Sequence, residues 1–139
     1  MKLVLIAALA LAACGGAPAK PTSTPDGKFE MRAYFLVLLR RGPAWTPEET
    51  PETKAIFDGH MANIVAMGKS GKLVLAGPID ADATDKAAIA GIFVFDVPAR
   101  ADVEALLAND PAVKIGRLVP EILPWYSAAG ITYPGKASP

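Results

Sequence analysis

The sequence MRAYFLVLL, residues 31–39, is an unbroken run of mostly aliphatic and aromatic side chains. It ends at Arg40-Arg41-Gly42-Pro43, where two charged residues are followed by two residues that favour turns. Successive side chains of a strand point to opposite faces, so a run that is apolar at nearly every position is suited to burial on both faces. Residues 31–39 therefore predict a buried strand.

A helix is predicted after this strand, from the low fifties to about Lys69. Thr46-Pro47-Glu48-Glu49 contains the residues of a helix start: a capping threonine, a proline suited to the first helical position and a glutamate that completes a capping box. Pro51 would delay or kink that start, and Ser70-Gly71 would end the helix. Residues on one face then recur at steps of three and four: Ile56, Phe57, His60, Met61, Ile64, Val65 and Gly68.

The rest of the pattern completes an alternation of strands and helices. Strands are predicted over residues 72–76, 89–97 and 118–125, with a helix over residues 98–108 and a short helical turn over residues 112–116. The order β-α-β-β-α-β is typical of a four-stranded antiparallel sheet with both helices on one face, an α+β sandwich of the ferredoxin-like kind. Because the first and third strands are apolar on both faces, the open sheet face is expected to pair with a second copy in a homodimer.

The N-terminal segment has the features of an export signal. Lys2 precedes an apolar run from Leu3 to Ala13, which is too short to span a bilayer as a mature helix. The sequence Leu11-Ala12-Ala13-Cys14 resembles the bacterial lipoprotein signal, which implies that residues 1–13 are removed and that Cys14 is lipidated. The expected location is then the bacterial cell envelope, as a membrane-anchored lipoprotein. An ordinary secretory signal, giving a periplasmic or secreted protein, is the alternative.

Changes in composition indicate the domain boundaries. Residues 14–28 contain Cys14 and a segment rich in Gly, Pro, Ser and Thr, which is typical of a flexible tether. Residues 29–126 are expected to form the folded domain. Residues 127–139 are mostly small or polar and are expected to form a flexible tail.

Several functional classes are excluded by composition and motif. The 139 residues include 14 Lys and Arg against 14 Asp and Glu, so the chain lacks the basic excess that nucleic-acid binding requires. One Cys and one His cannot build a zinc site of the Cys₂His₂, Cys₄ or His₃ kind, and no glycine-rich phosphate loop is present. The acidic turn with Asp80, Asp82 and Asp85 lacks the spacing of a calcium loop. We therefore expect no metal and no cofactor, and a small organic ligand at most.

Three segments, taken together, resemble the YCII-related domain family. They are residues 60–64 (HMANI) with the strand at 71–78 (GKLVLAGP), the turn at 109–116 (NDPAVKIG) and the last strand at 119–125 (VPEILPW). The resemblance covers about Glu30 to Trp125 and implies a dimeric α/β barrel with His60 and Asp110 as the active-site pair. The function of the family is largely unknown, and some relatives resemble lactone dehalogenases or isomerases of aromatic catabolism.

Two functions remain open for this pair. In the first, the protein is a cofactor-independent lyase or isomerase: an imidazole exchanges protons near neutral pH, and a carboxylate such as Asp110 orients it. In the second, the protein is a non-catalytic envelope module that binds a small molecule or serves structurally. His60 is then a core or helix-edge histidine, and Asp110 stabilises a turn. The two residues lie fifty positions apart, so only the fold can bring them together.

Other side chains have two interpretations each. Arg40, Arg41 and Arg117 could attract an anionic substrate or keep strand ends soluble. Trp125 and Tyr126 could wall a cleft or cover the sheet edge or dimer seam. The long, proline-rich loop from Arg40 to Pro51 could cover or reshape a pocket next to His60.

Overall fold

The computed structural model describes residues 30–131. The predicted signal peptide, the predicted lipidation site at Cys14, the predicted tether and residues 132–139 lie outside the described residues. Among the residues that are described, no helix is both long and apolar enough to cross a bilayer.

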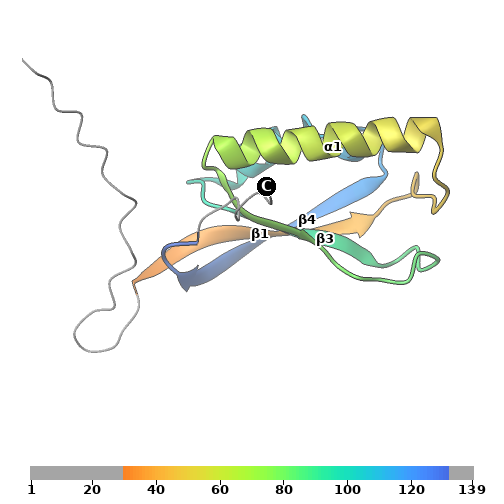
Figure 1. Ribbon diagram of the computed structural model, residues 1–139. Coiled ribbons are helices and arrows are strands. Elements are labelled where there is room, and N and C mark those ends of the chain that lie inside the picture. Colours follow the sequence, from red (N-terminus) through yellow and green to blue (C-terminus); the bar gives the residue numbers. More distant parts are fainter. Residues whose placement is uncertain (1–29, 132–139) are drawn as a thin grey trace, which may run out of the picture.

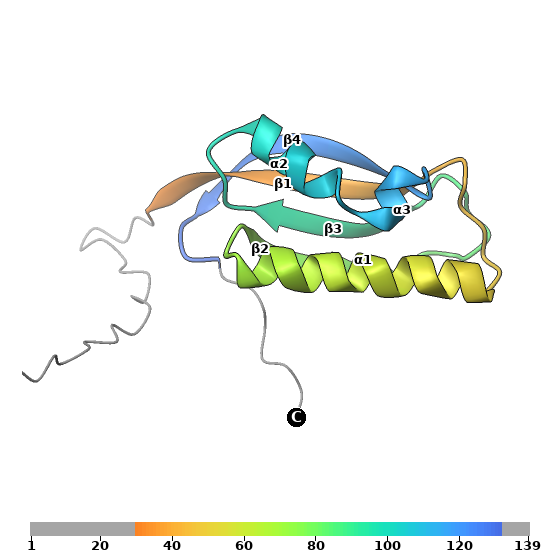
Figure 2. The same ribbon diagram turned by 90° about the horizontal axis from the view of Figure 1, so that it is seen from above.

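The elements follow the predicted order, and the predicted short helical turn forms α3. The strands are β1 (Met31–Arg41), β2 (Leu73–Pro78), β3 (Ile89–Phe95) and β4 (Leu118–Ala128), and the helices are α1 (Pro51–Lys69), α2 (Arg100–Leu107) and α3 (Pro111–Lys114). All strand pairs are antiparallel, in the order β2-β3-β1-β4. The helices lie on one face of this sheet, with α1 on the β2 side and α2 and α3 on the β4 side (Figures 1 and 2). The predicted ferredoxin-like α+β fold is confirmed.

The main core fills the space between the sheet and the helices. β1 contributes Val37 and Leu39 and β3 contributes Phe93 and Phe95, at alternate positions of each strand. The helices add Ile64, Met67, Val103 and Leu107. Each of these side chains is at most 6% exposed, and burying one such side chain contributes about 1.5–3 kcal/mol.

A second cluster lies on the opposite sheet face and changes the predicted end of the domain. Tyr34, Val74 and Val94 form it, and Ile131 packs against it. Ile131 belongs to the segment that its composition marked as a flexible tail, and β4 itself continues to Ala128, opposite Met31. The strand extends past Tyr126 because ladder hydrogen bonds use backbone groups and need no apolar side chains.

The start of α1 differs from the predicted one. The cap is Thr50 and not Thr46: Thr50 Oγ1 accepts from the Thr53 backbone N–H at 3.2 Å, and Thr53 Oγ1 accepts from the Thr50 backbone N–H at 2.9 Å. Pro51 occupies the first helical position, where proline has no N–H to lose. Residues 42–50 consequently form a loop ahead of the helix.

Candidate active site

The fold brings His60 and Asp110 into contact. His60 lies within α1, and its Nδ1 atom is 2.7 Å from Oδ2 of Asp110, which immediately precedes α3. Gly59 permits this approach, since a Cβ atom at that position would lie 2.8 Å from Cγ of Pro111. The small residue next to His60 therefore allows α3 to pack closely on α1.

Asp110 is completely buried, and donors surround its carboxylate. Oδ1 accepts from the backbone N–H groups of Ala112 (2.9 Å) and Val113 (3.3 Å) and so caps α3. Oδ2 accepts from His60 and from Nδ2 of Asn63 at 3.1 Å. Burial raises the pKa of Asp110, but the hydrogen bonds and charge of His60, with the donors from Asn63 and Val113, outweigh burial and hold that pKa below its usual value. Asp110 thus caps a turn and also holds the imidazole.

The contact with Asp110 determines which nitrogen of His60 is available for chemistry. An ionised carboxylate only accepts hydrogen bonds, so Nδ1 carries the proton and Nε2 of the neutral ring carries the lone pair. The ring stacks on Phe93 with centroids 6.0 Å apart, and the side chain is 12% exposed. Nε2 has no hydrogen-bond partner among residues 30–131 and is not sealed from solvent. His60 therefore has one ring nitrogen that is free to accept a proton or a hydrogen bond.

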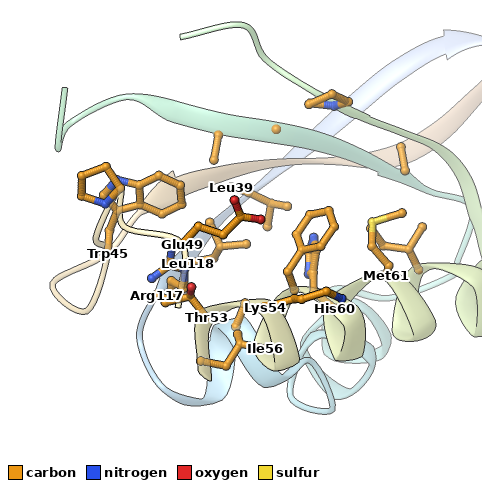
Figure 3. Close-up of a pocket in the computed structure, with 18 of the residues that line it drawn as sticks. Leu39, Trp45, Glu49, Thr53, Lys54, Ile56, His60, Met61, Arg117 and Leu118 are labelled. Atoms are coloured by element: carbon orange, nitrogen blue, oxygen red, sulfur yellow. The ribbon is translucent and has the colours of Figure 1, made fainter. Parts of the chain in front are cut away.

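His60 lines a pocket of about 710 Å³ between α1 and the sheet. Figure 3 shows its side chain together with others that line the pocket. The walls are mostly apolar, and the loop before α1 forms one side of the pocket, as its length suggested. Asp110 does not line the pocket and lies behind His60. The side chains that line it include Leu39, Trp45, Ile56, Met61, Pro78, Phe93, Arg117 and Leu118.

The structure separates the three candidate arginines. Arg40 is paired with Glu121, Nε to Oε2 at 2.7 Å, on the exposed surface. Arg41 and Arg117 both lie over the ring of Trp45, with guanidinium carbons 4.4 and 4.6 Å from its centroid. Of the three, Arg117 lines the pocket.

The remaining candidates lie away from the pocket. Trp125 packs against Tyr34, with ring centroids 6.0 Å apart, on β4. In the acidic turn, Asp82 Oδ1 accepts from the N–H and hydroxyl of Thr84, and the backbone carbonyls of Asp82 and Asp85 accept from Arg41. No group of three metal-ligating side chains occurs within residues 30–131.

Asn63 is a member of the site that the sequence did not single out. It follows His60 by three positions, so both side chains share one face of α1 and reach the same oxygen of Asp110. That spacing is the only signal in the sequence that could have indicated it.

The fold and site define a class: a ferredoxin-like α+β domain with a histidine–carboxylate pair at a pocket between helix and sheet. Residues 33–126 match the YCII-related domain family, and the chain belongs to that family. Among solved structures, a similar one is 5-chloro-2-hydroxyhydroquinone dehydrochlorinase from Burkholderia phenoliruptrix AC1100, in complex with 2,5-dihydroxybenzoquinone. It is 18% identical, with 66% of this chain and 92% of that chain covered and a TM-score of 0.47. No curated protein matches the chain.

Acid is expected to destabilise the fold through Asp110. Its folded pKa lies below the unfolded value near 3.8, so the unfolded chain binds more protons in this range. The stabilisation is complete above about pH 3.8 and is lost as pH falls through the folded pKa. Urea unfolding at a series of pH values should show this decline, and the decline should be shallower in Asp110→Asn. An equally steep decline in both chains would contradict the assignment.

Proposed function

We propose that this protein is a cofactor-independent lyase or isomerase that moves a proton on a small organic substrate. His60 acts as the base and acid, and Asp110 holds and stabilises it. The observation that supports this most directly is the 2.7 Å contact between His60 Nδ1 and Asp110 Oδ2, made on the wall of the pocket. A purely structural histidine would not need a free nitrogen at a cavity.

The proposed reaction begins with transfer of a proton from carbon to Nε2. The carbon lies next to a carbonyl group, so the electrons of the broken C–H bond enter an enolate. In a lyase reaction, the electrons then form a carbon–carbon double bond and expel a leaving group such as halide. In an isomerase reaction, Nε2 returns the proton to another carbon. Asp110 stabilises the imidazolium and does not itself take the proton.

The test is a proton-transfer assay in D₂O. The native chain is incubated with ketones, lactones and halogenated carbonyl compounds that carry an activated C–H bond, and ¹H NMR follows loss of that signal, with halide measured in parallel. We expect exchange or elimination above the buffer rate for at least one structural type. Binding of these compounds without exchange would contradict the proposal and favour a non-catalytic binding module.

We also propose that two copies associate through the open sheet face. Leu75, Leu123 and Trp125 are 36–37% exposed. Their cross-strand partners place them on the face opposite the helices. Burying such a surface contributes about 25 cal/mol per Å². Light scattering at micromolar concentration should give twice the chain mass, and Leu123→Glu should give the monomer. Val65→Glu, at an exposed position of α1, is the control, and a monomeric native chain would contradict the proposal.

We further propose that the domain works at the bacterial cell envelope, tethered through a lipid on Cys14. The support is the sequence itself, in which the single Cys follows a short apolar run and precedes a segment rich in Gly and Pro.

A further inference from the structure

Arg117 is a charged group of the pocket that the proposed chemistry does not use. Lys54 also lines the pocket, but it is paired with Asp58 at 2.6 Å. Arg117 has no acidic partner among residues 30–131. Its Nη1 and Nη2 atoms donate to neutral acceptors, the hydroxyl (3.2 Å) and the backbone carbonyl (2.7 Å) of Thr46. A guanidinium has five N–H groups, so three remain available.

The ring of Trp45, which lines the same end of the pocket, holds a second guanidinium that does not itself line the pocket. Arg41 also lies over this ring, and it too has no acidic partner in the described part of the chain. It donates to the backbone carbonyls of Asp82 and Asp85. Within residues 30–131, Nε1 of Trp45 and Nε of Arg41 are buried donors without an acceptor. Stacking on an aromatic ring limits the orientations of a guanidinium, so the charge of Arg117 is held in place.

The charged end and His60 are separated along α1. Thr46, which holds Arg117, lies in the loop before the helix, and Figure 3 shows Trp45 and Arg117 toward Thr53, with His60 farther along. Thr53 and His60 differ by seven positions, or about 10 Å of helix at 1.5 Å per residue. Apolar side chains line the pocket as well: Leu39, Ile56 and Leu118.

We propose that Arg117 binds the carboxylate of an elongated and otherwise apolar organic acid, whose other end lies at His60. The assignment of the second end rests on the proposed function, whereas the carboxylate site does not. Glu48 and Glu49 also line the pocket and repel anions, which penalises a doubly charged phosphate more than a carboxylate. A planar carboxylate also matches the fork of a single guanidinium.

The test uses ω-phenylalkanoates whose chains have two to five carbons, and compares the binding of each acid with that of its uncharged amide. Binding is followed at pH 7 by the ¹⁵N-resolved NMR signal of the Trp45 indole N–H. The chain has two tryptophans, so Trp125→Phe is used to assign this signal. We expect at least one acid to bind about tenfold more tightly than its amide, which corresponds to about 1.4 kcal/mol. Arg117→Gln should remove this preference, and Glu48→Gln with Glu49→Gln should increase it.

Arg40→Gln is the matched control, because it removes the same charge from an arginine paired with Glu121 outside the pocket. It should keep the preference for acids within about twofold. Arg117→Lys keeps the positive charge and should therefore keep part of the preference, which separates loss of the charge from disturbance of the loop. Equal binding of acids and amides, no binding of any acid, or equal losses in Arg117→Gln and Arg40→Gln would overturn the proposal. His60→Gln should retain acid binding. Absence of turnover by the native chain, with its preference for acids intact, would refute only the proposed function.

Discussion

His60→Gln is expected to lower the rate of proton transfer in the D₂O assay by about 10²–10⁴-fold, the usual contribution of a positioned general base. Glutamine has no basic nitrogen, but its amide N–H can still donate to Oδ2 of Asp110. The variant therefore removes the base while it preserves a donor to the buried carboxylate. The free energy of unfolding should change by only about 1 kcal/mol, which is less than the change in activation free energy.

Met61→Leu is the control for this variant. Met61 also lines the pocket and follows His60 directly, but it has no group that exchanges protons. Its replacement by a residue of similar volume should change the rate only a few-fold. If His60→Gln retained turnover within about threefold of the native chain, His60 would not be the base.

The fold was predictable because the order and periodicity of its elements carry most of the information. The boundaries were less predictable, and α1 illustrates why. Thr46–Glu49 and Thr50–Thr53 both offer the side chains of a capping box. The choice depends on tertiary contacts: Thr46 accepts from Arg117, and the backbone N–H groups of Gly42 and Ala44 donate to the carbonyls of Arg117 and Gly116. These bonds hold residues 42–46 in the loop, and the helix begins at the second threonine.

The candidate site was predictable only in part. The resemblance to a family indicated His60 and Asp110, but no local pattern could place two residues fifty positions apart within 2.7 Å. Asn63 was missed because a neutral amide on a helix face has no chemical signature until its acceptor is known. The packing of Trp45 with Arg41 and Arg117 was missed for a similar reason, since it joins the end of β1, a loop and the residue before β4.

Asp110→Asn should lower the rate of proton transfer about as much as His60→Gln, although it leaves the imidazole in place. Asparagine caps helices about as well as aspartate, so its Oδ1 can still accept from the N–H groups of Ala112 and Val113. Its NH₂ group then takes the place of Oδ2 and faces two former donors, His60 Nδ1–H and Asn63 Nδ2. This conflict is relieved if the His60 proton moves to Nε2 and the Asn63 amide turns to present its oxygen. Nε2 is then protonated where the base is needed.

The chain contains one histidine, so this change can be measured without a substrate. The ¹⁵N shifts of the neutral ring in a tag-free chain should report an Nδ1–H imidazole in the native protein and an Nε2–H imidazole in Asp110→Asn. Asp110→Ala is the contrasting variant: it leaves the Ala112 and Val113 N–H groups without their acceptor and should cost about 2–4 kcal/mol of stability. Full activity in Asp110→Asn, or an unchanged tautomer, would contradict the orienting role of the carboxylate. The orienting role and the capping of α3 use the same side chain but different oxygens. The two roles are separated if Asp110→Asn loses activity and shows the altered tautomer while its unfolding free energy is nearly unchanged.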